Sequence, residues 1–409
     1  MTVVSRRVDK KYGTHYAANV EAYRKYLQKN DLAFAMGLTD VKGDRSLRPA
    51  QQKQHKDFYV RIVEERSDGI IVSGAKTHIS QAPACNEVLI APCRAMQEDD
   101  SAYAVAFGIP LNAPGITMIC AQREIGEDAN LFDHPISKAV YINDATIVFD
   151  NVFIPNERVF LCGETKATRD LVHRFSDFQR FASATCRSGY IDLCIGAGMA
   201  LADYNGAAGF GHIRDTLVDM SVDSETLYGL VAGSAALATE LPSGVFLPET
   251  FSVNAAKLYM NEAILKAGQR LAEIGGGILV TRPSSVDLEI PGIGELLAKY
   301  HQGRAGVAVE DRLKMARLCE SLSGLAALTP ILSVIAAGPP ATRPPRCASA
   351  ISSFRRQSPI ARESWRNDSP LHTTAASTGP GPSILISPNS TWRRVFTITG
   401  VCWIMTPPF

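Results

Sequence analysis

The hydrophobic pattern changes period between Thr146 and Gly163, in the stretch TIVFDNVFIPNERVFLCG. On the N-terminal side, β-branched and aromatic residues run without a helical period. They run as far as Pro155, which lacks an amide donor and is therefore expected to end a strand. From Thr168 onward the apolar spacing is that of a helix. The pattern predicts a junction between a β-domain and a helical domain.

Short β-type runs dominate the chain from Phe58 to Val152 and are separated by Gly, Pro and acidic turns. Their number and spacing predict a compact sandwich or barrel, which we bound at residues 58–163. The runs are FYVRIVEE, GIIVSGAKTH, EVLIAP, AYAVAFGIP, GITMICA, KAVYI and TIVFDNV.

Four or five helical segments are predicted between Thr168 and Leu328, which favours an antiparallel bundle over residues 164–335. The first helix is expected to continue through Tyr204, and the third is expected to stop at three consecutive glycines. One face of the first helix is expected to carry Leu171, Val172, Phe175, Phe178 and Phe181.

Residues 1–57 read as the remnant of an N-terminal helical domain, with one amphipathic helix in 9–30. A polar turn follows at LTDVKGDRS, Leu38 to Ser46. Such a turn is often simply solvated. Alternatively, Lys42, Arg45 and the backbone amides around Gly43 hold an anion or the polar edge of a cofactor.

Residues 336–409 differ in kind from the rest of the chain. They hold eleven of the 23 prolines, all three tryptophans and eight Arg with no Lys. A disordered tail would lack Trp, and a folded domain would not carry so much Pro. We therefore expect this irregular tail to be out-of-frame translation that begins near Ile335.

Composition narrows the class of protein. Hydrophobic residues make up 46% and charged residues 20%, as in an enzyme-sized soluble protein. The net charge of +1 splits into a basic tail and about −5 on residues 1–335, so no nucleic-acid partner is expected. Nine cysteines without CxxC spacing favour a reducing cytoplasm. No uninterrupted apolar run approaches the roughly eighteen residues of a membrane span.

Six motifs in order give the chain a family resemblance, from about Lys29 to about Ser333. They are NDLAFAMGLTDVKGDRS, SGAKTHIS, AYAVAFGIPLNAPGITMI, TIVFDNVFIPNERVFLCGE, GMALADYNG and EIGGGILVTRPSSVD. The chain resembles the 4-hydroxyphenylacetate 3-hydroxylase family, which also contains 4-hydroxybutyryl-CoA dehydratase. The resemblance implies an acyl-CoA dehydrogenase-like α+β fold, in which a central β-domain precedes an antiparallel helical bundle, and an N-terminal domain that is truncated here.

The resemblance also implies FAD, which needs an apolar slot, a few donors and cations or amides for its phosphates. A lone His is otherwise a common loop residue, and a glycine run after a helix is otherwise a C-cap and turn. Contacts to the adenosine end often come from a second subunit in this fold, so a homotetramer is expected. The resemblance assigns cofactor contacts to Lys42, Arg45, Ser46, His78, Ile79, Ser80, Glu273, Gly275, Gly276 and Gly277.

The dehydratase branch also carries an iron–sulfur cluster, and this chain departs from its pattern. Gln179 stands where that branch has a His ligand, and Cys186, seven residues on, matches a Cys ligand. Because an amide is not a cluster ligand, no metal is expected. Ser183 replaces a Tyr between the two. Cys186 is then expected to be a small buried residue.

Asp144 matches a carboxylate that acts as a base in the dehydratase. It is either a proton-transfer group facing a dry flavin pocket or a turn residue in YINDAT. We expect a flavin-dependent monooxygenase that hydroxylates a phenolic substrate and receives reduced FAD from a separate flavin reductase, with Asp144 and Gln179 as catalytic candidates. The alternatives are a 4-hydroxybutyryl-CoA dehydratase or vinylacetyl-CoA Δ-isomerase acting on an acyl-CoA, and an inactive remnant of one.

Overall fold

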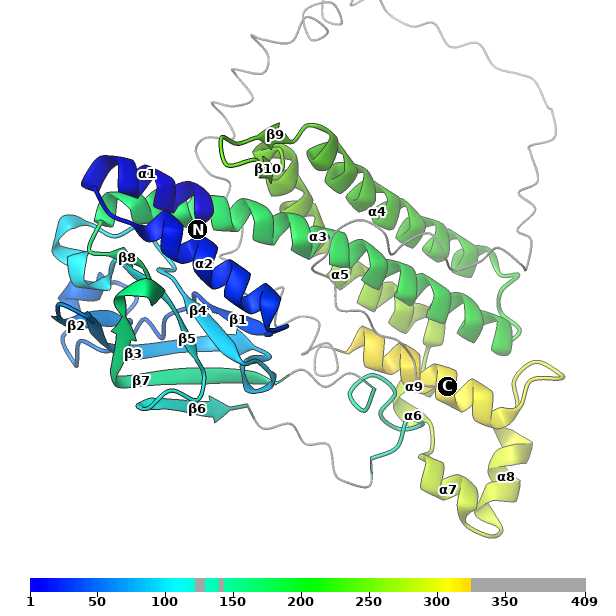
Figure 1. The fold of residues 1–409 in the computed structure, drawn as a ribbon. Helices are drawn as coiled ribbons and strands as arrows, with labels where there is room; N and C mark the ends of the chain where they lie inside the picture. Colours follow the sequence, from blue (N-terminus) through cyan, green and yellow to red (C-terminus); the bar gives the residue numbers. More distant parts are fainter. Residues whose placement is uncertain (122–128, 140–142, 325–409) are drawn as a thin grey trace, which may run out of the picture. The chain divides into compact units, whose positions relative to one another are not determined.

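A computed structural model describes residues 1–121, 129–139 and 143–324 of the protein (Figure 1). Strands dominate as far as residue 162, and helices dominate from residue 165 onward. This confirms the predicted α+β, acyl-CoA dehydrogenase-like layout. The predictions for residues 336–409 and for the end of the KAVYI run, at 140–142, lie outside the described residues.

The strand region contains two four-stranded sheets. The first has the order β1-β4-β5-β8, with β1 parallel to β4 and the other pairs antiparallel. The second, in the order β2-β3-β7-β6, is antiparallel throughout. Their bounds are β1 Phe34–Gly37, β2 Arg61–Glu65, β3 Gly69–Ser80, β4 Glu87–Ile90, β5 Val105–Pro110, β6 Ile116–Cys120, β7 Asp144–Pro155 and β8 Val159–Cys162.

The two sheets share one hydrophobic core. Alternate residues of β7, among them Ile147 and Phe149, are buried in it. Phe149 meets Phe107 of the other sheet edge-on, with 5.8 Å between ring centroids. The opposite face of β7 carries residues that are only half-buried or exposed, such as Asp144 and Thr146. This second face is therefore available for a ligand.

Three long helices run side by side in the second half of the chain (Figure 1). They are α3 Thr165–Tyr204, α4 Gly211–Ala236 and α5 Thr250–Gly275. Together with α9, Val309–Ser323, they bury a core of aliphatic, Met and Cys side chains. Shorter elements in this half are β9 Thr239–Glu240, β10 Phe246–Leu247, α6 Ile278–Thr281, α7 Ser285–Glu289 and α8 Ile293–Tyr300.

Two helices precede the first strand, α1 Thr2–Tyr12 and α2 Tyr16–Lys29. The single helix predicted over residues 9–30 is wrong at its start, because Gly13 at φ +71° ends α1. The amphipathic part corresponds to α2, which buries Val20, Tyr23 and Leu27. Tyr23 packs against Phe160 of β8 at 5.4 Å between ring centroids. Among the described residues, the remaining elements are four 3-10 turns: η1 Pro49–Gln51, η2 Ala82–Ala84, η3 Glu98–Tyr103 and η4 Asn156–Arg158.

The predicted change from strands to helices is confirmed, because β7 ends at Pro155 and α3 begins at Thr165. The expected apolar face at the start of α3 is wrong in part: Leu171 is buried, whereas Phe178 is 37% exposed. Sequence reasoning also missed β1, which lies before residue 58 yet pairs with β4. The proposed domain boundaries at 58 and 164 remain predictions.

Residues 129–139, in the connection from β6 to β7, contact the helical half. The Asp133 carboxylate accepts hydrogen bonds from the Ser285 hydroxyl at 2.5 Å and from the Ser285 amide. Ile136 belongs to the hydrophobic core of the bundle. Adjacent antiparallel strands need only a short connection, so this long excursion ties the two halves of the chain together.

Candidate functional site

A β-bulge in β3 shapes the end of the second sheet. Thr77 and His78 together oppose Thr146 of β7, because the register steps from Lys76 opposite Ile147 to Ile79 opposite Ala145. His78 adopts φ +57° and is exposed, and the Thr77 and Thr146 hydroxyls lie 3.0 Å apart. Bulges of this kind re-aim side chains and are common beside functional sites. Here two hydroxyls and an imidazole are brought to one strand end.

The polar turn from Lys42 to Ser46 lies next to this bulge. The Thr39 carbonyl, three residues before Lys42, accepts a hydrogen bond from the Thr77 amide at 2.8 Å, and Asp40 forms an isolated β-bridge with Lys76. Lys42 and Gly43 both have positive φ, +79° and +54°. Left-handed backbone of this kind presents amides to anions or polar ligand edges in many proteins. Here the Lys42 amide donates to the Phe58 carbonyl at 3.3 Å, so Gly43 is the candidate donor.

Within the turn, the side chains are held differently. The Ser46 hydroxyl and amide both donate to Asp44, at 2.7 and 2.9 Å, and Arg45 is exposed. A Cβ on Gly43 would lie 2.4 Å from the Phe58 ring, so only glycine fits there. The backbone of the turn is therefore more sharply defined than its cationic side chains.

Asp144 begins β7 opposite Ser80. Its Oδ1 atom and that of Asn143 are buried and accept no hydrogen bond from the described part of the chain. The Asp144 backbone carbonyl accepts from Ala121 at 2.8 Å, so Asp144 is a strand residue rather than only a turn residue. Buried acceptors without a donor are rare in folded proteins and mark sites where a ligand donor fits.

Gln179 lies half-buried on α3, two residues after Asp177. Asp177 accepts a hydrogen bond from the Thr250 hydroxyl of α5 at 3.2 Å. Burial raises the pKa of the Asp177 carboxyl, although that hydrogen bond and nearby arginines act in the opposite direction. This stretch of α3 therefore holds an acid that retains its proton more readily than usual.

The expectation that Cys186 is buried is wrong, because its side chain is exposed. Ser183, Ala184 and Arg187 are the buried residues around it. They mark the side of α3 that faces the bundle core, so position 186 falls on the outer side.

The glycine turn after α5 is a helix cap in this structure. Gly276 has φ +61° and ψ −153°, and its amide donates to the Ala272 carbonyl at 2.8 Å. Gly275 is buried, and a Cβ there would meet Leu279 at 2.6 Å. Glu273 is exposed and accepts a hydrogen bond from Gln269 at 3.3 Å. The cap accounts for the glycines, and the cofactor contact remains a prediction.

The structure thus joins one group of predicted residues and leaves the others apart. The turn at 42–46, the step at 78–80 and Asp144 are connected by strand register and by hydrogen bonds. Within residues 1–121, 129–139 and 143–324, no hydrogen bond or ion pair links Gln179 or the glycine turn to that group.

Two buried cations of the helical half were not predicted from the sequence. Lys257 of α5 and Arg187 of α3 are 3% and 5% exposed. Burial, with the charges of Arg187 and Arg180, lowers the pKa of Lys257 to about 8. The sequence signal is helical spacing. Lys257 lies four residues after Val253 and three before Met260, and Arg187 lies three residues after Ala184 and four before Ile191. A charged residue at such a position is unusual.

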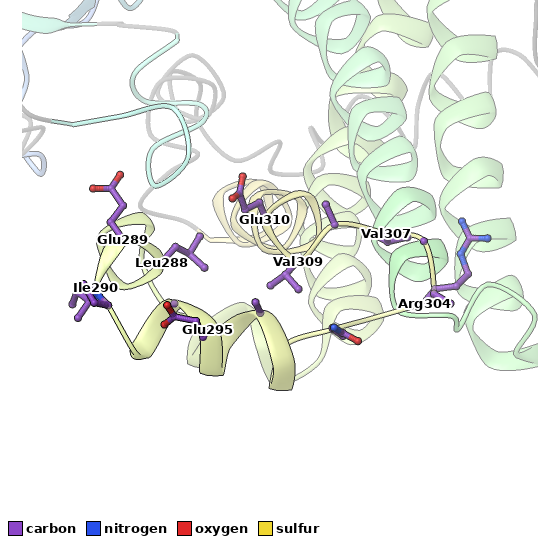
Figure 2. A pocket seen from close by; sticks show the side chains of 15 residues that line it. Leu288, Glu289, Ile290, Glu295, Arg304, Val307, Val309 and Glu310 are labelled. Atoms are coloured by element: carbon purple, nitrogen blue, oxygen red, sulfur yellow. The ribbon is translucent and has the colours of Figure 1, made fainter.

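A hollow of about 750 Å³ lies elsewhere, between α7, α8 and the start of α9 (Figure 2). Three glutamates, Glu289, Glu295 and Glu310, contribute to its wall together with aliphatic side chains (Figure 2). None of the predicted site residues lines it. It is therefore separate from the group at the end of β3 and β7.

No helix among the described residues is long and apolar enough to cross a membrane. No group of three or more His, Cys, Asp or Glu within them is arranged to hold a metal ion.

Solved structures resemble this fold closely. An oxygen-tolerant archaeal 4-hydroxybutyryl-CoA dehydratase from N. maritimus superposes with a TM-score of 0.78 at 31% identity, covering 87% of this chain and 70% of that one. The oxygenase component of 4-hydroxyphenylacetate 3-monooxygenase, complexed with FAD, superposes with a TM-score of 0.74 at 26% identity, covering 89% and 75%.

Among curated relatives, the 4-hydroxybutyryl-CoA dehydratase/vinylacetyl-CoA Δ-isomerase of Clostridium aminobutyricum is 36% identical over 328 residues, 77% of this chain. The 4-hydroxyphenylacetate 3-monooxygenase oxygenase component of Thermus thermophilus is 28% identical over 320 residues, again 77% of this chain. The chain spans 66% of the length of each relative. Residues 1–161 match the N-terminal family model of 4-hydroxyphenylacetate 3-hydroxylase and residues 168–343 match the C-terminal model. The chain therefore belongs to the 4-hydroxyphenylacetate 3-hydroxylase family.

Proposed function

We propose that the end of β3 and β7 binds FAD. The observation that carries this proposal is the pair of buried acceptor atoms, Asn143 Oδ1 and Asp144 Oδ1, at the strand end. The Thr77 and Thr146 hydroxyls supply donors beside them, and the Gly43 amide in the left-handed turn would supply another. A flavin ring carries both an N–H group and carbonyl oxygens, so this donor and acceptor set fits it.

The other contacts expected from the family are part of the same proposal. Arg45 and Ser46 would extend the turn contact, and His78, Ile79 and Ser80 would line the strand end. Glu273 with Gly275, Gly276 and Gly277 would meet the phosphate and adenosine half. We propose a homotetramer, because contacts from a second subunit would bring the glycine turn to the cofactor.

For the reaction, we propose a reduced-flavin-dependent monooxygenase that hydroxylates a phenolic substrate. Reduced FAD supplies the electrons that activate dioxygen when it is bound. Asp144 would accept the phenol proton, because its buried Oδ1 lacks a donor in the described part of the chain. Gln179 would orient the substrate through its amide. A solved relative of this type binds both FAD and 4-hydroxyphenylacetate.

A separate flavin reductase would supply the reduced cofactor, since the related monooxygenases are described as oxygenase components. A reducing cytoplasm is the proposed location. Both are inferences from the family and from the cysteine pattern.

The second candidate is a 4-hydroxybutyryl-CoA dehydratase or vinylacetyl-CoA Δ-isomerase acting on an acyl-CoA. The 36% identity with the Clostridium aminobutyricum enzyme favours it. Gln179 weighs against it, because an amide replaces the His that ligates the cluster in that branch.

Two assays separate the candidates. The purified protein, with an added flavin reductase, NADH and a panel of phenols, is expected to convert a phenol to a catechol, measured by liquid chromatography. Uncoupled NADH oxidation without any catechol would refute the monooxygenase. Iron bound in stoichiometric amount, with dehydration of 4-hydroxybutyryl-CoA under anaerobic conditions, would establish the second candidate instead.

A further inference from the structure

Lys76 is a buried cation in the second sheet. It is 2% exposed, one residue before the bulge at Thr77 and His78. Its ammonium group contacts three oxygens: Asp40 Oδ1 at 2.7 Å, the Leu38 carbonyl at 3.0 Å and the Ala91 carbonyl at 2.9 Å. An ammonium has three donors, so Lys76 is fully satisfied.

These acceptors come from separate parts of the chain. Leu38 and Asp40 lead directly into the turn at 42–46, and Ala91 follows the end of β4. The Thr77 amide adds a fourth tie, to the Thr39 carbonyl. Lys76 therefore links the turn to the bulged end of β3. Both segments are among those proposed to contact the cofactor.

Asp40 is equally enclosed, with a side chain 2% exposed. Its Oδ1 also accepts from the Val60 amide at 3.3 Å, while its Oδ2 is buried and accepts no hydrogen bond from the described residues. Burial and the Asp40 charge raise the pKa of the neighbouring Cys93 thiol. Each charge of so deeply buried a pair depends on the other, because either charge alone would be strongly disfavoured.

We propose that the buried Lys76–Asp40 pair is the positioning element of the FAD site. It fixes the distance and orientation between the turn at 42–46 and the step at 78–80, so that both can contact one cofactor. Neither side chain touches FAD in this proposal, because both side chains are only 2% exposed and contact each other. The inference rests on the proposed FAD binding and assigns residues outside the contact set.

The test separates positioning from simple stability. Replacing both charges together, Lys76→Met with Asp40→Leu, leaves no buried unpaired charge and is expected to fold. The control replaces a second ion pair, Glu87→Leu with Arg158→Met. Its charged atoms lie 2.7 Å apart, and Glu87 of β4 is 2% exposed while Arg158 of η4 is 20% exposed. Thermal unfolding followed by circular dichroism reports the fold, and fluorescence titration of the apo-protein reports the dissociation constant for FAD.

We expect the Lys76/Asp40 variant to melt near the wild-type temperature and to bind FAD at least about tenfold more weakly. The control variant is expected to keep the wild-type affinity. A folded Lys76/Asp40 variant with wild-type affinity would overturn the proposal, as would an equal loss in the control. If the wild-type protein itself binds no FAD, the proposed function fails first, and the two failures are distinguished.

Hydrogen exchange of the wild-type protein tests the same coupling without any variant. The Lys42 amide donates to the Phe58 carbonyl, and the Thr77 amide donates to the Thr39 carbonyl. We expect FAD to slow exchange at both amides together. Protection of only one of the two segments would contradict a shared positioning element.

Discussion

Two buried lysines, one in each half of the molecule, show how differently the same residue can be accommodated. Lys76 in the sheet is 2% exposed, and Lys257 in the bundle is 3% exposed. Lys76 faces a carboxylate at 2.7 Å. Around Lys257, the charges that shift its pKa are those of the cations Arg187 and Arg180. Burial is similar, but burial and neighbouring cations lower the pKa of Lys257, whereas a carboxylate lies directly against Lys76.

The comparison distinguishes a buried charge that stabilises the local structure from one that is unfavourable in the folded state. A buried cation that is matched to an acid and two carbonyls contributes to a defined geometry. A buried cation beside other cations destabilises the folded state whenever it is protonated. Natural sequences retain such local costs mainly at functional sites, so the bundle interior around Lys257 is a region of interest in its own right.

The largest expected effect is a contrast between Lys76→Met and Lys257→Met. Lys76→Met leaves Asp40 buried and unpaired, so we expect the free energy of unfolding to fall by about 3–5 kcal/mol. Lys257→Met removes a disfavoured charge, and we expect a rise of about 1–2 kcal/mol at pH 7. Urea denaturation followed by circular dichroism measures both. Equal destabilisation by the two variants would abolish the distinction between the lysines.

Stability should also depend on pH through Lys257. Its pKa is lowered from 10.5 to about 8 in the folded protein. Between these values the unfolded chain binds more protons than the folded one, so the free energy of unfolding rises with pH, by at most about 3 kcal/mol. The folded protein is therefore free of the cost of charging Lys257 above pH 10.5, and it bears this cost in full once the pH has fallen below 8.

Subtracting the free energy of unfolding of Lys257→Met from that of the wild type isolates the effect of Lys257. The difference between wild type and Lys257→Met should change over this pH window, whereas an exposed control such as Lys266→Met should follow the wild type. A difference that stays constant from pH 8 to 10.5 would show that Lys257 does not titrate in this range.

Sequence patterns predicted the elements better than they predicted the contacts between them. The strand that ends at Pro155 and the single long helix through Tyr204 follow from local rules of proline and periodicity. The four residues of β1 were missed, because so short an apolar run has no distinguishing period. Phe178 and Cys186 were placed wrongly because helical spacing gives a face without saying what covers it.

The candidate site was predictable only where it is local. Turn residues around Gly43 and the strand end at His78 could be named from motif and chain order. The Lys76–Asp40 pair could not, because its members are 36 positions apart and only the sheet register brings them together. The same reasoning leaves Gln179 and the glycine turn as predictions, since their relation to the sheet depends on tertiary and subunit contacts.

Glycine substitutions sharpen the comparison between the two halves. Gly43 at φ +54° and Gly276 at φ +61° both incur backbone strain as alanine, which costs about 1–3 kcal/mol. At Gly43 the new methyl group would also meet Phe58 at 2.4 Å, whereas at Gly276 nothing lies within 4 Å. We expect Gly43→Ala to lower both the melting temperature and FAD affinity. Gly276→Ala should also lower the melting temperature, and it should lower FAD affinity because the glycine turn is proposed to contact the cofactor. Unchanged FAD affinity in this variant would remove the glycine turn from the proposed site.

The smallest expected effect concerns Cys186 on the outer side of α3. Because this thiol is exposed, Cys186→Ser should change the free energy of unfolding by no more than about 0.5 kcal/mol. Cys194→Ser is the matched control on the same helix, since Cys194 is fully buried and a hydroxyl there should be destabilising. The iron content and visible spectrum of Cys186→Ser should equal those of the wild type. Loss of iron in this variant alone would mean that Cys186 ligates a cluster. That result would favour the dehydratase as the function of the protein.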